Sequence, residues 1–228
     1  DLFKKYTSNK ESYNMWRNHI SSFGIGEWMN NDFVSGTKGM LPKHEYYNKY
    51  YGRTSWNSST IISMAIGQGE LLLTPIQMAN ISAIIANRGF YFTPHIVKSI
   101  QGNEKIDTTF LEKKYTTINP KHFDVIIEGM EKVIKKSDGT ANNIKSNSIS
   151  ICGKTGTAQN PHGEDHSIFI AFAPKENPEI AIAVYIENGG WGSTWAAPIA
   201  GLMIEKYLKA DINLDVEKFI TNGVINSK

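Results

Sequence analysis

Two apolar segments in the last third of the chain constrain the fold most strongly. Residues 167–173 and 179–187 are rich in aliphatic, β-branched and aromatic side chains, and the polar segment Pro174-Lys175-Glu176-Asn177-Pro178 separates them. Strand-like runs joined by a short turn predict an antiparallel hairpin. Because both runs are apolar almost without interruption, we expect the sheet to be covered on both faces. Residues 148–152 alternate weakly and predict a further strand beside the hairpin.

Capping residues and prolines predict two helices before this sheet. Thr74 and Pro75 begin an apolar run that ends at Gly89, with proline at the start and glycine after the end. Its side chains are apolar on nearly every side, so this helix is expected to be buried. Asn119 and Pro120 begin a second run whose apolar residues recur on one face, so this helix is expected to be amphipathic.

The remaining segments give weaker signals. Residues 16–23 predict a short helix that ends at Gly24, and residues 194–208 predict a terminal helix. The polar, tyrosine-rich stretch 45–56 is interpreted as an ordered surface loop, and residues 211–228 as a tail. Together these patterns predict an α+β fold, in which a central antiparallel sheet has the buried helix on one side and terminal helices on the other.

The composition is that of a folded protein and argues against several functions. The 228 residues include 24 basic and 22 acidic side chains, a net charge of +2, so no nucleic-acid partner is expected. The single cysteine, Cys152, allows no disulfide within the chain. No window approaches the roughly 18 consecutive apolar residues that a membrane helix needs.

The strand at residues 148–152 leads into Lys154-Thr155-Gly156-Thr157-Ala158-Gln159, the segment with the clearest chemistry. A lysine ammonium beside hydroxyl groups at a strand edge suits an anionic group, most simply a carboxylate. Gly156 has no side chain, so a ligand can lie along the backbone as an added strand. The N–H of Thr157 is a candidate donor to the oxygen of a tetrahedral intermediate. The segment therefore predicts an edge that binds the end of a peptide near its reacting carbonyl.

Two other interpretations of this segment compete with that one. A bare Lys-Thr-Gly can occur by chance in a loop. Gly153-Lys154-Thr155 also resembles the end of a phosphate-binding loop, but that motif needs glycine where Ser148 stands and a helix immediately afterwards. Gly156, Pro161 and Gly163 would break such a helix, so we reject nucleotide binding.

Histidine and cysteine side chains near this segment have simple interpretations. His162 and His166 have the spacing of two metal ligands, but no further His or Cys cluster accompanies them, so we expect no metal and no cofactor. His166 is expected at the start of the facing strand, where it borders the cleft or hydrogen-bonds Asp165. Cys152 is expected to be a buried small apolar residue. The alternative is a nucleophile with Lys154 as its cationic partner.

The Lys-Thr-Gly segment and several further segments together resemble the penicillin-binding protein 2 family, which are class B penicillin-binding proteins. Lys-Thr-Gly itself is a motif of penicillin-binding proteins and serine β-lactamases. The order and spacing of the segments agree over roughly residues 16–208. The further segments are Ala65-Ile66-Gly67-Gln68-Gly69 running into Thr74-Pro75-Ile76-Gln77-Met78-Ala79, Phe169-Ile170-Ala171-Phe172-Ala173-Pro174, Tyr185-Ile186-Glu187-Asn188-Gly189-Gly190, and Ser22-Phe23-Gly24-Ile25-Gly26.

The resemblance implies a fold, an activity and a setting. The fold would be of the serine β-lactamase and transpeptidase kind but incomplete, with residues 1–228 as the carboxy-terminal part of one transpeptidase domain whose core is about residues 16–210. The activity would be peptidoglycan D,D-transpeptidation, in which a serine attacks the D-Ala-D-Ala bond of a stem peptide and penicillins acylate the same serine. The partners would be stem peptides, β-lactams and cell-elongation membrane proteins, on the periplasmic side of the inner membrane.

The resemblance also implies roles for the residues of the Lys-Thr-Gly segment. Lys154 and Thr157 would be catalytic: Lys154 would organise the polar network and the substrate carboxylate, and the Thr157 amide would complete the oxyanion hole. The substrate-binding residues would be Thr155, Gly156, Thr157, Gln159 and His166.

The nucleophile is the main departure from the family. The Ser-x-x-Lys and Ser-x-Asn groups of the family lie upstream of every segment matched here. We therefore expect no Ser-x-x-Lys tetrapeptide in this chain, and we expect the chain to lack the nucleophile and to be inactive alone. Ser12-Tyr13-Asn14 has the form Ser-x-Asn but lies too close to Gly24, and is interpreted as a chance match. Two alternative functions stay open: a β-lactamase or penicillin-sensing domain, and a non-catalytic interaction module of the cell-elongation machinery.

Overall fold

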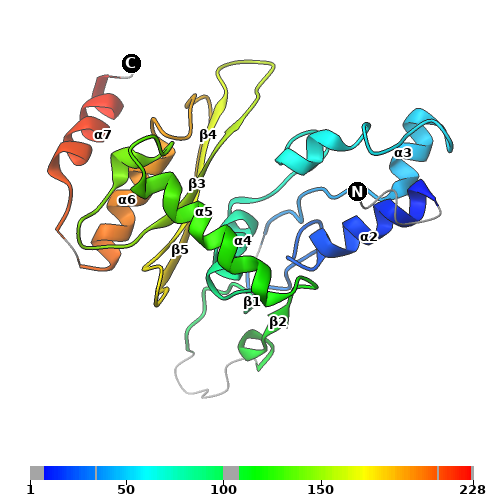
Figure 1. Ribbon diagram of the computed structural model, residues 1–228, viewed down its shortest axis with the longest axis horizontal. Helices are drawn as coiled ribbons and strands as arrows, with labels where there is room; N and C mark the ends of the chain where they lie inside the picture. The colour runs from blue at the N-terminus through cyan, green and yellow to red at the C-terminus, as the bar shows by residue number, and fades with distance from the viewer. Residues whose placement is uncertain (1–7, 34, 100–107, 210, 227–228) are drawn as a thin grey trace. The chain divides into compact units, whose positions relative to one another are not determined.

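The computed structural model describes residues 8–33, 35–99, 108–209 and 211–226 (Figure 1). The chain forms two compact units, of which the first comprises residues 1–77 and 90–118 and the second residues 78–89 and 119–228. The helices are α2 (Asn9–Ser21), α3 (His44–Tyr51), α4 (Pro75–Ala86), α5 (Phe123–Lys135), α6 (Ala196–Tyr207) and α7 (Leu214–Asn226), and the short 3-10 helices are η1 (Ile62–Ile66), η2 (Thr108–Leu111), η3 (Pro120–His122) and η4 (Asn142–Ile144).

A three-stranded antiparallel sheet forms the centre of the second unit, with the strands in the order β3-β4-β5 (Figure 1). These strands are β3 (Cys152–Ala158), β4 (His166–Ala173) and β5 (Ile180–Ile186). The hairpin predicted from the two apolar runs is confirmed. Because β3 pairs with β4 and has no partner strand on its other side among the described residues, it is an edge strand.

Helices cover both faces of this sheet, which the uninterrupted apolar strands predict. α6 contributes buried alanines to a core cluster with Ala171 of β4. Phe172 and its register partner Cys152 cluster instead with Ile127 of α5 and with Ala86 at the end of α4. Since neighbouring side chains of a strand point to opposite faces, α6 lies on one face of the sheet and α5 on the other.

The two helices predicted from capping signals are confirmed. α4 begins at Pro75, and its residues 76–86 are buried or partly buried. The Asn119 side chain accepts a hydrogen bond of 3.1 Å from the backbone N–H of Lys121. The chain continues through η3 into α5, which buries Phe123, Ile127, Met130 and Ile134 on one face.

The tyrosine-rich stretch 45–56 of the first unit is not the predicted loop, because most of it forms α3. Tyr47 and Trp56 are buried and pack with Tyr13 of α2, the ring centroids lying 5.3 and 5.7 Å from that of Tyr13. Tyrosine is polar enough to look exposed in a sequence, yet its hydroxyl can be buried when it finds an acceptor. Here the Tyr13 hydroxyl donates to the carbonyl oxygen of Pro42 at 2.7 Å.

The helix predicted for residues 16–23 is longer than expected. α2 begins at Asn9, where the Ser8 side chain caps it by accepting a hydrogen bond of 3.2 Å from the backbone N–H of Glu11. The prediction relied on apolar residues, and the first turn of this helix is polar. The first unit also contains a two-stranded antiparallel sheet of β1 (Phe90–Tyr91) and β2 (Lys114–Tyr115).

The tail predicted for residues 211–228 contains α7, which corrects that prediction for residues 214–226. Phe219 of α7 stacks on Trp195, with the ring centroids 5.3 Å apart. The backbone N–H of Asn213 donates to the Glu205 carboxylate of α6 at 2.9 Å. Residues 227–228 lie outside the described residues. Six of the 13 residues of this helix are apolar, and the interpretation as a tail overlooked them.

Candidate functional site on the edge strand

The Lys-Thr-Gly segment lies on β3, the edge strand of the described sheet. Lys154 is exposed and residues 155–158 are partly exposed, whereas Cys152 and Gly153 are buried. The strand therefore leaves the core at Lys154 and continues along the surface. An edge strand presents backbone N–H and C=O groups that can pair with an extended ligand.

Side chains from both faces of the strand reach this edge. Lys154 and Gly156 belong to one face and Thr155 and Thr157 to the other, because side chains alternate along a strand. In the ladder with β4, Thr157 is opposite Ser167. A ligand lying along the edge would have the ammonium group on one side and two hydroxyl groups on the other.

The polar groups of Lys154 and Thr155 already take part in hydrogen bonds. Lys154 Nζ donates to the backbone carbonyl oxygen of Thr155 at 2.6 Å. An ammonium group has three donors, so this bond leaves two for an anionic ligand. Thr155 Oγ1 lies 3.0 Å from Thr140 Oγ1, on the segment before η4. Either hydroxyl can be the donor in this contact, so Thr155 can still donate to a ligand while Thr140 donates to it.

His166 is the first residue of β4, as the sequence predicts, but its partner is not Asp165. The ring Nδ1 accepts a hydrogen bond of 3.1 Å from the backbone N–H of Asn188, and the ring centroid lies 5.3 Å from that of Tyr185. Asp165 accepts instead from the backbone N–H of Asn160 at 3.2 Å. Because Nδ1 acts as an acceptor, the neutral ring carries its proton on Nε2.

Gln159 is exposed and follows the last residue of β3, at the start of the loop that joins β3 to β4. Hydrogen bonds order this loop: the Asn160 amide donates to the Asn188 side chain at 2.7 Å, and the backbone N–H of Gly190 donates to the carbonyl oxygen of Asp165 at 2.7 Å. The structure thus brings five of the predicted residues together on β3 and its continuation, with His166 at the start of the paired strand.

Three residues that contact this edge are not among those predicted from the sequence. Thr140 reaches Thr155 from a loop, and no sequence signal marks that contact. Ser167 is fully buried and its hydroxyl donates to the carbonyl oxygen of Trp191 at 2.9 Å. Gly192 packs on the backbone of Gly156. A serine inside an apolar strand and a glycine-rich loop are the only hints that the sequence offers.

Cys152 is buried, as predicted, and the nucleophile alternative is wrong. Burial raises the pKa of its thiol to about 12. Its side chain is on the face of β3 that packs against α5. A buried thiol that stays protonated at neutral pH has no nucleophilic role.

Ser12-Tyr13-Asn14, which has the form Ser-x-Asn, lies inside α2. Ser12 is fully buried, and its hydroxyl donates to the carbonyl oxygen of Ser8 at 2.9 Å. Tyr13 is part of the aromatic cluster described above. These contacts support the interpretation of this tripeptide as a chance match.

The tetrapeptide Ser-x-x-Lys occurs once in the sequence, at Ser35-Gly36-Thr37-Lys38. The prediction that this tetrapeptide is absent from the chain is therefore wrong. Serine and lysine three residues apart share a face when they lie on a helix. This segment lies in an exposed loop without helix, and the carbonyl oxygen of Lys38 accepts from Gln77 Nε2 at 3.0 Å. The local structure therefore does not pair the Ser35 hydroxyl with the lysine.

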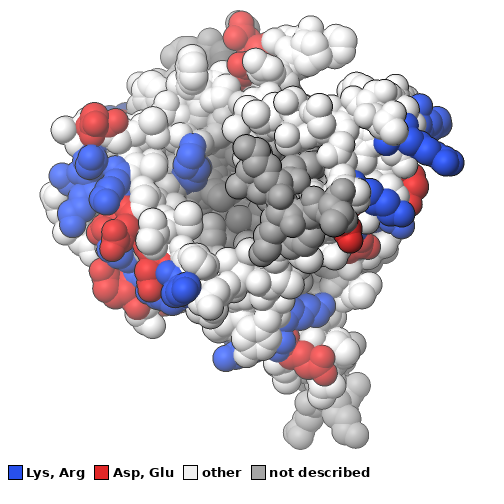
Figure 2. Space-filling view, turned by 45° about the vertical axis from the view of Figure 1, so that its right-hand side comes forward, with Lys and Arg blue, Asp and Glu red and all other residues white. Residues whose placement is uncertain are grey.

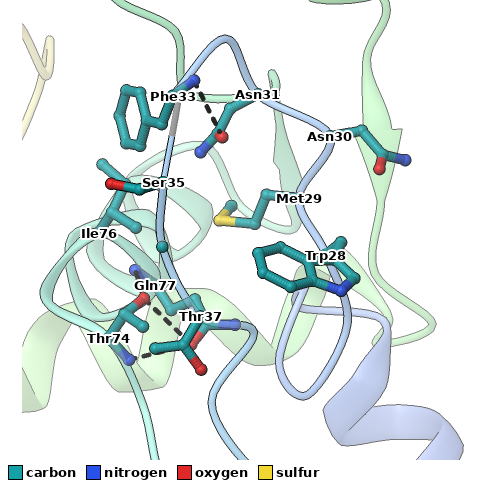
Figure 3. Close-up of a pocket in the computed structure, with 11 residues that line it drawn as sticks. Trp28, Met29, Asn30, Asn31, Phe33, Ser35, Thr37, Thr74, Ile76 and Gln77 are labelled. Carbon is teal, nitrogen blue, oxygen red and sulfur yellow. Dashed lines mark hydrogen bonds between the residues drawn. The ribbon is translucent and has the colours of Figure 1, made fainter.

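The same loop lines a cavity of about 490 Å³ in the first unit (Figure 3). Met29 points into this hollow, whereas Asn30 points away from it (Figure 3). Thr74 and Gln77, at the start of α4, lie at its base. None of the predicted site residues lines this cavity.

Charge and hydropathy give no further site among the described residues. Basic and acidic side chains are interspersed on the face shown in Figure 2, in keeping with the net charge of +2. Within the part of the chain that the structure describes, no three His, Cys, Asp or Glu side chains gather as metal ligands would. No described helix has the length and apolar character that crossing a bilayer requires.

Known proteins resemble this chain over most of its length. The family described as the penicillin binding protein transpeptidase domain matches residues 4–205. The peptidoglycan D,D-transpeptidase MrdA of Haemophilus influenzae is 31% identical in an alignment of 247 positions that covers 96% of this chain and 38% of that protein. The chain therefore spans well under half the length of this relative.

Solved structures agree with the sequence comparison. Penicillin-binding protein 2 of Pseudomonas aeruginosa, in complex with WCK 5153, is 32% identical with a TM-score of 0.74, over 87% of this chain and 44% of that one. Penicillin-binding protein 2 of Helicobacter pylori, in complex with MreC, is 26% identical with a TM-score of 0.66, over 89% of this chain and 35% of that one. The predicted α+β fold is confirmed by these neighbours. The chain belongs to the penicillin-binding protein transpeptidase domain family.

Proposed function

We propose that residues 1–228 form the carboxy-terminal part of a peptidoglycan D,D-transpeptidase domain. The observation that carries this proposal is the Lys-Thr-Gly segment on the exposed edge of an antiparallel sheet, in a chain of this family. The edge suits a peptide that ends in a carboxylate, because it combines backbone groups, an ammonium group and hydroxyl groups.

The proposed reaction has two acyl-transfer steps. A serine hydroxyl attacks the carbonyl carbon between the two D-alanines of a stem peptide, the terminal D-Ala leaves as the amine, and an ester forms on the serine. An amine of a neighbouring stem peptide then attacks the ester, the new amide forms, and the serine hydroxyl is restored. β-Lactams acylate the same serine because their strained amide occupies the position of the D-Ala-D-Ala bond.

The residues of β3 have distinct roles in this proposal. Lys154 attracts the terminal carboxylate and organises the polar network beside the serine. Thr155 and Thr157 donate hydroxyl hydrogen bonds to that carboxylate. The backbone N–H of Thr157 donates to the oxygen of each tetrahedral intermediate, a contribution of roughly 3 to 4 kcal/mol to the barrier. Gln159 and His166 border the end of the groove where the donor peptide enters.

The nucleophilic serine and its lysine are proposed to come from a segment outside residues 1–228. The loop structure of Ser35-Gly36-Thr37-Lys38 supports this proposal, because it does not present the helical Ser–Lys pair. The complete protein would act at the periplasmic face of the inner membrane, and a cell-elongation protein comparable to MreC is its proposed partner.

Labelling with fluorescent penicillin tests the proposed function. The complete protein should form a stable adduct that mass spectrometry locates on a serine outside residues 1–228, and it should cross-link stem peptides. The isolated chain of 228 residues should not label. A labelled serine within the isolated chain would contradict the assignment of the nucleophile, and an unlabelled complete protein would contradict the transpeptidase itself.

The same experiment separates the alternatives. Rapid hydrolysis of the adduct, with penicillin consumed in many turnovers, would identify a β-lactamase. Absence of both the adduct and cross-linking activity would leave a non-catalytic interaction module. A stable adduct without cross-linking would identify a penicillin-sensing domain.

A further inference from the structure

The loop between β5 and α6 lies directly on the backbone of the Lys-Thr-Gly strand. A Cβ atom placed on Gly192 would lie 2.5 Å from the carbonyl oxygen of Gly156 and 2.4 Å from that of Ile168. Carbon and oxygen atoms that are not bonded do not approach so closely. Gly192 is therefore in contact with both strands of the β3–β4 ladder at the position of Gly156.

The hollow that Gly192 fills results from the register of the sheet. Gly156 and Ile168 are opposite each other, and a Cβ atom on Gly156 would lie 3.3 Å from Cβ of Ile168, so both residues direct their side chains to the same face. On the other face this pair presents only backbone. Gly192 lies on that face, because its carbonyl oxygen accepts from the N–H of Ala197 at the start of α6.

Ser167 fixes the loop on both sides of Gly192. Its buried hydroxyl donates to the carbonyl oxygen of Trp191 at 2.9 Å and accepts from the backbone N–H of Ala196 at 3.2 Å. The neighbouring residue Trp191 is 72% exposed, so its side chain does not anchor the loop. Further hydrogen bonds to the loop come from the Asn143 side chain, which donates to the carbonyl oxygen of Ser193 at 3.0 Å, and from Gly190, whose N–H donates to Asp165. Next to Gly192 itself, the loop is held by Ser167 of β4 and by the contact with Gly156.

We propose that Gly192 is a positioning residue for the acyl-transfer site, which sets the position of the β3 backbone at Gly156 and Thr157. The inference rests on the proposed function of this edge. The backbone φ of Gly192 lies outside the left-handed region, so alanine is sterically excluded by β3 rather than by the conformation of the loop. To accept a Cβ atom, the loop and the strand must separate by roughly 1 Å.

The test compares Gly192→Ala with Gly201→Ala in the complete protein. Gly201 is on α6, and a Cβ atom there would meet the side chain of Ile144 at 3.1 Å, so this variant disturbs packing away from the edge strand. We expect Gly192→Ala to slow acylation by penicillin roughly 10- to 100-fold, since a displacement of about 1 Å has effects of this size. Gly201→Ala should stay within about twofold of the wild-type rate at a comparable loss of melting temperature. Wild-type acylation of Gly192→Ala would overturn the proposal.

Ser167→Ala tests the same contact if Gly192→Ala does not fold. This variant removes two hydrogen bonds of the loop without adding an atom, and it should slow acylation severalfold more than Gly201→Ala does. Equal rates in these two variants would overturn the positioning role.

Hydrogen exchange measures the positioning role of Gly192 independently of the acylation reaction. If the wild-type protein is not acylated, the proposed function fails, and the positioning role is then measured by exchange of the amides in residues 152–158. Faster exchange in Gly192→Ala than in Gly201→Ala supports the role. Unchanged exchange contradicts it.

Discussion

The side-chain Nε2 of Gln77 donates a hydrogen bond of 3.0 Å to the carbonyl oxygen of Gly24, 53 residues earlier in the chain. Both residues belong to segments through which the sequence resembles its family. Gln77 is 1% exposed, and its side chain also donates to the carbonyl oxygen of Lys38 at 3.0 Å and accepts from the backbone N–H of Thr74 at 3.0 Å. The Thr-Pro-Ile-Gln segment therefore joins three parts of the first unit.

Replacement of this glutamine should destabilise the first unit. Gln77→Leu keeps the volume but removes the donor of the part-buried hydrogen bonds to the carbonyl oxygens of Gly24 and Lys38. We expect the free energy of unfolding to fall by about 2 kcal/mol, because a hydrogen bond contributes about 1 kcal/mol to stability and two are lost. Urea denaturation measures this change.

The exposed glutamine Gln159 provides the matched control for that experiment. Gln159→Leu should change the free energy of unfolding by less than about 0.5 kcal/mol. If both variants unfold at the same urea concentration, the buried network of Gln77 does not have the structural role assigned to it.

An ion pair between Glu131 and Lys175 should give the second unit a defined pH dependence. Lys175 Nζ lies 2.7 Å from Glu131 Oε2, on α5. The hydrogen bond from Lys175 holds the pKa of Glu131 below its usual range and raises the pKa of Lys175. Glu131→Gln should lower the free energy of unfolding by roughly 1 to 2 kcal/mol at neutral pH.

The directions of the two pKa shifts define the pH range in which the ion pair between Glu131 and Lys175 stabilises the folded protein. A carboxyl group with a lowered folded pKa stabilises above its unfolded pKa of about 4.3 and loses the contribution as pH falls through the folded pKa. A lysine whose pKa is raised in the folded state contributes its full stabilisation below its unfolded pKa of about 10.4. It loses this contribution as pH rises through the folded pKa. The difference between wild type and Glu131→Gln should therefore be constant from about pH 5 to 10 and shrink in acid. A difference that persists at pH 2 would contradict this account.

Cys152 should be unreactive in the folded protein. Burial raises the pKa of its thiol to about 12, so very little thiolate is present at pH 8 and reagents have no access. Iodoacetamide should modify Cys152 only after urea unfolds the second unit. Alkylation at the rate of a free thiol in native buffer would place Cys152 at the surface and reopen its role as a nucleophile.

Segments with strong local signals could be predicted from the sequence, and contacts between segments could not. The β4–β5 hairpin and the starts of α4 and α5 follow from strand periodicity, a proline turn and capping residues, which act within a few neighbours. α3 was missed because polar tyrosines such as Tyr47 can be buried when their hydroxyls find acceptors. The same limit applies to the site: the sequence predicts Lys154 and Thr157, but the contacts of Thr140 and Gly192 with β3 depend on how distant segments pack.

Acylation of Lys154→Ala in the complete protein is the measurement that tests the central claim most directly. Lys154 is exposed, so its removal should leave the melting temperature unchanged. The account predicts that the rate of acylation by fluorescent penicillin falls about 100-fold or more, a loss typical of an electrostatic group at an acyl-transfer site. Lys132→Ala, which removes an exposed lysine from α5, should be acylated at the wild-type rate. If Lys154→Ala is acylated as fast as Lys132→Ala, the edge of β3 is not the acyl-transfer site.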